Sequence, residues 1–323
     1  MINKLFRPLL AAALVAGIPS FSWAQISADL GRSVSALDTT SANRSGFLQQ
    51  DVASTLPPPQ EQNTFAPVTP GDQDIGQQFI LKRNDHVEPW RVTLDNNVFW
   101  TDNGANVRTG KIDDWFWVGG LNVGYQPQIT KRIYLDLNVG EHWFQYNRLS
   151  VLDFQSSEAS AGVIVMAPEL WNTIWYANYY YQRITQGLSY GPIYDTNDLR
   201  VGVQKSIIID RLNSVNFGLQ TAFAVAADPQ ALRRNEYTLT AGYNLKIMRE
   251  LTLGLGYHLS YFDYFVVDRH DWFNNFSLQL AYQPTSWLEM DLGYTFTVNR
   301  SNVSSFSYDT QLAGPSVSLK AKF

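Results

Sequence analysis

A two-residue alternation of side chains recurs along most of the sequence and restricts the folds open to this chain more than any other feature. In the stretch LTLGLGYHLSY (residues 251–261), all six odd-numbered residues are apolar or aromatic, and the residues between them are small or polar. This period predicts a β-strand with one apolar face and one small, polar face. The apolar face would point inwards in a water-soluble β-sandwich and outwards, to lipid, in a membrane-spanning barrel.

The same pattern recurs from residue 90 to the C-terminus and predicts about twelve strands of about 11 to 15 residues. Strands of globular proteins are usually about five or six residues long, whereas a tilted strand needs about 9 to 11 residues to cross a bilayer. The length therefore favours the barrel. The predicted strands cover residues 90–101, 114–126, 132–146, 153–166, 172–183, 196–207, 213–226, 235–247, 250–262, 273–283, 286–298 and 311–323.

The predicted connections and the aromatic residues also favour a membrane barrel. Tight turns alternate with longer polar loops, as periplasmic turns and outer loops do in such barrels. Aromatic residues of the apolar face collect at the two strand ends, which predicts two interfacial girdles. They are Trp90, Tyr125, Tyr282 and Trp287 at the turn end and Trp100, Trp115, Trp143, Tyr181, Tyr237 and Tyr261 at the loop end. Eleven glycines lie on the other face, where they would leave space inside a barrel or let its strands bend.

The chain before the strands divides into two segments. Residues 1–24 predict a secretory signal peptide, because Lys4 and Arg7 precede a short apolar run and Ser22 and Ala24 precede a cleavage site. Residues 25–88 are proline-rich and predict a poorly ordered, partly short-helical periplasmic linker. The alternative is a segment that docks inside or beneath the barrel. The barrel itself is expected over residues 89–323.

The last ten residues, GPSVSLKAKF, place Val317, Leu319 and the terminal Phe323 on one face. This segment resembles the C-terminal signal by which the assembly machinery of Gram-negative bacteria recognises outer-membrane barrels. Together with the signal peptide and the amphipathic strands, it gives the chain a resemblance to porin-like outer-membrane β-barrel proteins, with no motif of one subfamily. The resemblance implies an all-β fold, a single closed antiparallel transmembrane barrel, located in the outer membrane and in contact with its lipid and the barrel-assembly machinery.

If the apolar face of each strand meets lipid, the residues that alternate with the apolar ones line the lumen. Charged residues expected toward the periplasmic mouth are Arg91, Asp95, Asp136, Lys246, Glu289, Asp291, Lys320 and Lys322. They would form either a salt-bridged network at the barrel seam or a constriction that sorts solutes by charge, and their mixed signs predict weak selectivity. Residues expected to line the outer mouth include His142, Glu158, Tyr180, Asp198, Arg200 and His258. Such groups suit polar or sugar-like solutes, and they equally suit a solvated wall.

We therefore expect a narrow, weakly selective channel for small hydrophilic solutes. The alternative is a closed structural or anchoring barrel whose N-terminal segment plugs the lumen or binds an envelope partner. A third interpretation is a lipid-modifying enzyme, because His258-x-Ser260 resembles part of the His-x-Ser-Asn-Gly motif of outer-membrane phospholipase A. However, Tyr261 stands where that motif has Asn, and we expect the pair to face the lumen, so we expect no enzymatic activity.

Other classes of function find little support in the sequence. The formal net charge of −5 argues against nucleic-acid binding. The four histidines are scattered without the spacing of metal ligands, and no glycine-rich phosphate loop follows a strand. We therefore expect neither a metal nor a cofactor. The lipid face of a barrel has the same character whether or not it packs against a neighbour, so the sequence predicts no oligomeric state.

Overall fold

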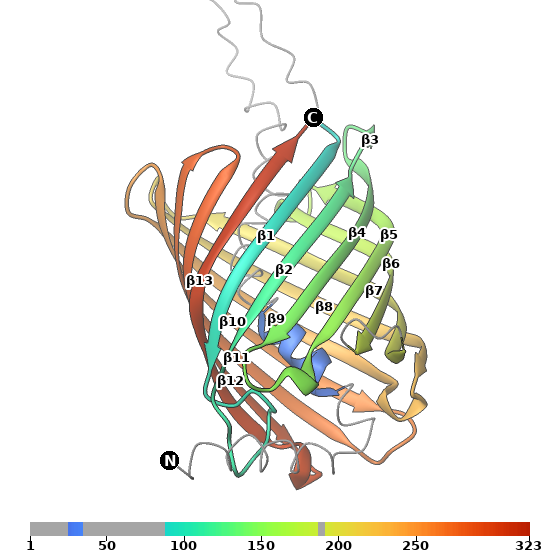
Figure 1. Cartoon of the computed structure of the whole chain (residues 1–323). Coiled ribbons are helices and arrows are strands. Elements are labelled where there is room, and N and C mark those ends of the chain that lie inside the picture. Colours follow the sequence, from blue (N-terminus) through green and yellow to red (C-terminus); the bar gives the residue numbers. More distant parts are fainter. Residues whose placement is uncertain (1–24, 35–87, 187–190) are drawn as a thin grey trace, which may run out of the picture.

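The protein is a closed antiparallel β-barrel (Figure 1). The computed structural model describes residues 25–34, 88–186 and 191–323. Twelve strands of this part form the wall, as predicted, and the three-residue strand β3 extends the turn before β4. The strands are β1 (Trp90–Thr101), β2 (Asp114–Tyr125), β3 (Gln128–Thr130), β4 (Ile133–Tyr146), β5 (Phe154–Ala167), β6 (Thr173–Gln186), β7 (Pro192–Ile208), β8 (Asn213–Asp228), β9 (Arg234–Lys246), β10 (Leu251–Tyr264), β11 (His270–Thr285), β12 (Leu288–Ser301) and β13 (Tyr308–Lys322).

Closure of the sheet depends on the pairing of its first and last strands. β1 pairs with β2 on one side and with β13 on the other, and β2 pairs with β4. The remaining wall strands pair antiparallel with their neighbours in the sequence. Lipid offers no hydrogen-bond partner to backbone groups, so a closed ladder is the form in which strands can cross a bilayer.

The apolar face of the alternation points outwards. Leu255 on β10 is 45% exposed, and its cross-strand partner Leu278 on β11 is 42% exposed. On the opposite face of β10, Ser260 is 1% exposed and contacts other lumen residues. The stretch 251–261 therefore turns its leucines toward lipid and its small and polar residues toward the lumen.

Aromatic residues at the two strand ends pair across neighbouring strands. At the turn end, Trp90 and Tyr125 are cross-strand partners with ring centroids 4.5 Å apart. At the loop end, Tyr261 pairs with Tyr237 on one side and with Trp272 on the other. These rows lie on the outward face and match the girdles predicted for the two membrane interfaces.

Several strands extend further than predicted. β7 begins at Pro192 and β11 begins at His270, whereas the alternation predicted starts at residues 196 and 273. The added residues at the start of β7 include Tyr194, which is buried, and Asp195. The backbone ladder continues beyond the lipid-facing band, where neither face needs to be apolar and the alternation fades.

Three loops at the loop end of the barrel contain short 3-10 helices: η2 (Ser150–Leu152), η3 (Gln230–Leu232) and η4 (Ser304–Phe306). The fully buried carboxylate of Asp114 holds the first of these loops, accepting hydrogen bonds from the backbone N–H groups of Arg148 at 2.9 Å and Leu149 at 2.8 Å. Leu149, Leu152 and Leu232 are buried, so these loops fold over apolar surface.

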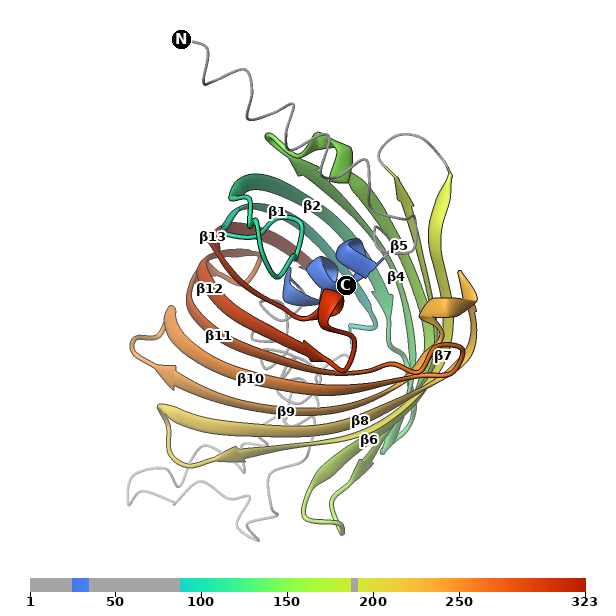
Figure 2. The ribbon, with the colours of Figure 1, turned by 90° about the horizontal axis from the view of Figure 1, so that it is seen from below.

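A helix formed by residues 25–34, called the lumen helix below, lies inside the barrel (Figure 2), in its loop-end half (Figure 1). Of the two positions considered for residues 25–88, these ten residues therefore take the one inside the barrel. Residues 35–87 of that segment and the predicted signal peptide lie outside the described residues. In the part of the chain that the structure describes, no helix is both long and apolar enough to cross a membrane.

Candidate functional site: the lumen and its helix

The lumen helix has two faces with different surroundings. Gln25, Asp29, Arg32 and Ser33 follow a spacing of three or four residues and lie on one face. Ser27, Gly31 and Val34 lie on the opposite face by the same rule. The first face, called the docking face below, contacts the wall formed by β9 to β13.

Arg32 is the centre of the docking face. Its guanidinium donates to Asp29 at 3.1 Å within the helix and to Glu236 on β9 at 2.5 Å. It also lies 4.8 Å from the ring centroid of Phe262 on β10, a cation–π contact. Glu236 accepts a second charged hydrogen bond from Arg234 at 3.0 Å. The charge-assisted bond from Arg32 therefore ties the helix to the wall, and the bond from Arg234 holds Glu236 in place on β9.

Three further contacts fix the orientation of the helix. The Tyr308 hydroxyl of β13 donates to Asp29 at 3.0 Å. Arg269, in the loop after β10, donates to the side-chain oxygen of Gln25 at 2.5 Å. The hydroxyl oxygens of Ser33 and Thr297 on β12 lie 3.3 Å apart. With Glu236 on β9, these partners come from four separate elements, so the register of the barrel determines where the helix can bind.

Apolar residues complete the contact between helix and barrel. Ala28, Leu30 and Val34 belong to a buried cluster that includes Phe116 and Phe262 of the wall. Burial of such side chains stabilises the contact in addition to the charged hydrogen bonds. The loop-end half of the lumen is thus partly filled by aromatic side chains and the helix.

Four of the residues predicted for the outer mouth, Glu158, Tyr180, Asp198 and Arg200, lie on the consecutive strands β5, β6 and β7. Glu158 on β5 accepts hydrogen bonds from Gln182 at 3.1 Å and Ser156 at 3.3 Å. The Arg200 guanidinium lies 3.2 Å from the ring centroid of Tyr180. Arg200 also pairs with Asp198 at 3.7 Å.

His142 and His258, the two histidines predicted for the outer mouth, occupy different parts of the wall. The Nε2 atom of His142 on β4 lies 3.4 Å from the side-chain nitrogen of Asn122 on β2. His258 lies on β10, with Nε2 2.9 Å from the Ser260 hydroxyl, and that hydroxyl lies 2.8 Å from Thr238. Among the described residues there is no group of three His, Cys, Asp or Glu side chains that could hold a metal ion.

Six of the charged residues predicted near the periplasmic mouth meet at the seam of β12, β13 and β1. Lys320 pairs with Glu289 at 2.8 Å. Ser316 donates to Asp291 at 3.2 Å and Ser318 donates to Asp95 at 2.6 Å. The remaining two seam residues, Arg91 and Lys322, are cross-strand partners.

Asp136 and Lys246 lie elsewhere on the wall. Asp136 on β4 accepts a hydrogen bond from Asn138 at 3.0 Å. Lys246, the last residue of β9, is exposed at the rim. The charged residues therefore form one cluster at the seam and two separate positions, rather than a complete ring.

The C-terminal residues occupy the outward face at the seam. Val317 is 38% exposed and Leu319 is 41% exposed on the lipid side of β13. Phe323 exchanges two backbone hydrogen bonds with Trp90, at 2.9 and 3.2 Å, and its ring stacks on that of Trp90. The terminal residue thus helps to join the last strand to the first.

Sequence reasoning missed the docking face of the lumen helix. The spacing of Ile26, Leu30 and Val34 indicates a short helix, but the polar face of Gln25, Asp29, Arg32 and Ser33 was not interpreted. The signal that could have found it is the pairing of opposite charges at Asp29 and Arg32, three residues apart.

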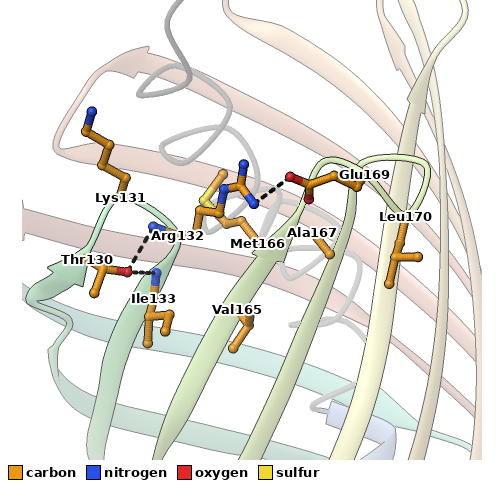
Figure 3. Close-up of a pocket in the computed structure, with 9 residues that line it drawn as sticks. All are labelled: Thr130, Lys131, Arg132, Ile133, Val165, Met166, Ala167, Glu169 and Leu170. Atoms are coloured by element: carbon orange, nitrogen blue, oxygen red, sulfur yellow. Dashed lines mark hydrogen bonds and ion pairs between the residues drawn. The ribbon is translucent and has the colours of Figure 1, made fainter.

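A hollow lies at the rim of the barrel, at the turn end of β4 and β5 (Figure 3). Its volume is about 550 Å³, and Thr130, Ile133, Val165 and Leu170 contribute to its lining. The Arg132–Glu169 ion pair crosses it, with both side chains more than half exposed. Such an exposed pair contributes little to stability or binding, so this rim hollow is not the candidate site.

Comparison with solved structures places the barrel among known outer-membrane folds. The COG4313 outer membrane channel from Pseudomonas putida F1 is 11% identical, with a TM-score of 0.54, covering 72% of this chain and 96% of that chain. The NanC porin is 12% identical, with a TM-score of 0.43, covering 70% and 98%. The translocator domain of autotransporter NalP from Neisseria meningitidis is 10% identical, with a TM-score of 0.40, covering 73% and 90%.

No protein-family model matches the chain, and no curated protein matches it. The likeness to the Pseudomonas putida channel covers nearly all of that chain and corresponds to the barrel of this one. The chain therefore has the fold of porin-like outer-membrane β-barrels, as the sequence predicted.

Proposed function

We propose that this protein is an outer-membrane channel that lets small hydrophilic solutes pass through a lumen narrowed by the helix of residues 25–34. The observation that carries the proposal is a closed barrel of twelve long strands whose polar faces point inwards. A polar lumen bounded by an apolar outer surface separates a water-filled path from lipid.

The expected bore is narrow. Barrels of eight strands are filled by their own side chains, whereas those of 16 to 18 strands leave a wide aqueous channel. A twelve-stranded barrel lies between these cases, and the lumen helix reduces its opening further. The rate at which solutes pass would therefore fall steeply as their size increases.

Ionic selectivity is expected to be weak. The seam cluster carries both signs, with Lys320 paired to Glu289. The docking face likewise pairs Arg32 with Glu236. Paired charges leave little net potential along the path, so neither cations nor anions are strongly favoured.

The proposed setting is the bacterial outer membrane, with the short turns in the periplasm. The chain would contact outer-membrane lipid and would be inserted by the barrel-assembly machinery through Val317, Leu319 and Phe323. We assign no catalytic role to His258 and Ser260, because nucleophilic catalysis needs a third group that orients the base. Among the described residues, no carboxylate accepts a hydrogen bond from the Nδ1 atom of His258, the atom at which such a group would act.

Liposome swelling tests the proposal. The refolded mature chain would be placed in liposomes and diluted into isotonic arabinose, glucose or raffinose. We expect swelling that is fastest in arabinose and slowest in raffinose. An absence of swelling from protein that shows the heat-modifiable migration of a folded barrel would refute the channel function.

The docked helix also favours a second candidate, a closed anchoring barrel. Its contacts bury Gln25, Asp29 and Ser33 to at least nine-tenths, as expected for a permanent plug. In that case the wild type would not transport solutes, and transport would appear only in a variant that lacks the docked helix. Swelling in arabinose by the wild type would exclude this candidate.

A further inference from the structure

We propose that small neutral polyhydroxylated solutes, polyols or monosaccharides, bind and pass between the Gly31 face of the lumen helix and the wall of β2, β4, β5 and β6. This inference rests on the channel function proposed above and specifies its path and its solute class. A cavity at this place is lined by helix residues on one side and wall residues on the other. The helix would therefore act as one wall of the path rather than as its plug.

The helix presents its smallest side chains to this cavity. Ser27, Gly31 and Val34 line it, opposite to the face that docks on β9 to β13. A Cβ atom added at Gly31 would meet no atom within 4 Å. The cavity and the room for a Cβ atom at Gly31 thus place an opening on this side of the helix among the described residues.

The size of the cavity fits a small solute. Its volume is about 220 Å³. This exceeds what one or two water molecules need and falls below the range of about 300 to 1,000 Å³ that holds drug-sized ligands. A monosaccharide or a linear polyol matches this scale better than an oligosaccharide or a peptide.

The wall offers the hydrogen-bonding groups that hydroxyl-rich solutes use. Side-chain amides of Asn122 and Gln182, the Ser156 hydroxyl and the Glu158 carboxylate line the cavity. Each can donate to or accept from a hydroxyl group. Such groups replace the hydration of a polyol without requiring a charge on the solute.

Aromatic rings supply the apolar part of the site. Phe144 and Phe154 line the same cavity and stack on each other with centroids 4.1 Å apart and planes at 11°. The C–H faces of a sugar or polyol can pack on such rings while its hydroxyl groups bind the amides. A site with apolar surface and a few placed polar groups is typical of small-molecule recognition.

The charge of the cavity favours a neutral solute. Among the described residues of its lining, Glu158 is the one acidic or basic side chain apart from His142. Its Oε1 atom already accepts from Gln182 and Ser156, and Arg200 acts on it electrostatically. The Glu158 carboxylate would repel an anion. The nearby Arg200 guanidinium offsets the attraction of this carboxylate for a cation.

A reversible cross-link allows the path to be tested with the helix held in place. The chain contains no cysteine, and the hydroxyl oxygens of Ser33 and Thr297 lie 3.3 Å apart. The double variant Ser33→Cys/Thr297→Cys therefore gives one defined pair, whose oxidation is verified by a mobility shift under non-reducing conditions. Arabinose swelling and planar-bilayer current would be measured on this oxidised full mature chain.

Gly31 supplies the matched pair of variants. In the oxidised background, Gly31→Ala adds one methyl group to open space and should keep at least half of the swelling rate. Gly31→Phe should lower that rate at least tenfold, because its ring fills the cavity. Neither change should prevent helix formation, because glycine is the poorer helix former of each pair.

The outcomes separate this inference from the channel function. Equal swelling by the Gly31→Phe and Gly31→Ala forms would place the path elsewhere and overturn the inference while leaving a channel. Swelling that vanishes on oxidation and returns on reduction would show that the helix must leave, which also overturns it. An absence of swelling from the wild type as well would refute the channel function itself.

A second measurement tests the solute class. Glucose added to the bilayer chamber should reduce the current in steps as it occupies the site. The variant Gln182→Leu removes amide hydrogen bonds and should raise the glucose concentration for half block about tenfold. An unchanged half-block concentration, or no block by glucose, would contradict a polyol site at this wall.

Discussion

Replacing Arg32 with serine should weaken the docking of the lumen helix on the wall. The expected loss of docking free energy is about 2 kcal/mol, a value that follows from the contacts of Arg32. Removing one partner of a buried ion pair costs about 3 to 5 kcal/mol. Here the Arg32 side chain is 23% exposed, and in the variant Glu236 would still be paired with Arg234 at 3.0 Å. The loss of docking free energy therefore lies below that range. The lost contact with Phe262 contributes about 0.5 to 1 kcal/mol of this total.

Such a loss changes the ratio of docked to undocked helix about 30-fold, because each 1.4 kcal/mol is a factor of ten. The assay uses Ser33→Cys as a reporter, since Ser33 is 1% exposed and the chain has no other thiol. A charged thiol reagent reaches this position when the helix leaves the wall. Labelling should therefore be about 30-fold faster with Arg32→Ser present.

A matched control uses an arginine remote from the helix. Arg183 pairs with Asp195 at 3.7 Å and is 43% exposed. The change Arg183→Ser should leave the labelling rate of the reporter within a factor of two. Equal labelling rates in the Arg32→Ser and wild-type backgrounds would refute the view that these contacts hold the helix.

Three further predictions concern the barrel wall. Leu255→Arg should lower the free energy of unfolding by about 2 to 4 kcal/mol in lipid, and Leu255→Ala by clearly less, because an arginine at the bilayer midplane loses its hydration; equal effects in urea titrations would contradict the outward facing. Deleting Phe323 should impair both refolding and assembly in cells, since it removes two backbone bonds to Trp90, whereas Phe323→Ala should impair assembly in cells alone; normal membrane levels of both would argue against an assembly signal. Glu289→Gln should lower the unfolding free energy by about 3 kcal/mol, because Glu289 is buried and the side chain of its partner Lys320 is only 10% exposed. The same change should leave the reversal potential in a salt gradient unchanged; a shifted potential would instead identify a constriction.

The barrel could be predicted because lipid imposes one rule on every strand. In β10, Leu255 and the residues two positions away on either side must be apolar, whatever their neighbours are. The inward orientation of Glu158, Arg200 and Glu289 then follows from their positions alone, because they alternate with the lipid-facing residues of their strands. Strand ends obey no such rule, and for this reason the starts of β7 and β11 were predicted three or four residues late.

Contacts within the lumen were harder to predict, because they depend on which residues the barrel brings together. Arg32 and Glu236 are 204 residues apart in the sequence. Their meeting depends on the strand register and on the depth at which the helix lies. The same holds for Gly202, one of the eleven glycines that were predicted to leave open space or let their strands bend. A Cβ atom at this position would collide with the ring of Tyr176 on the neighbouring strand.

Single-channel conductance in a planar bilayer tests the central claim most directly. The mature chain and its Arg32→Ser variant would be compared in the same salt, with folding verified by heat-modifiable migration. The account predicts a steady current from the wild type and a larger current from the variant, because the undocked helix narrows the lumen less. Silence from both folded proteins would contradict a channel, and equal currents would contradict a lumen narrowed by the helix.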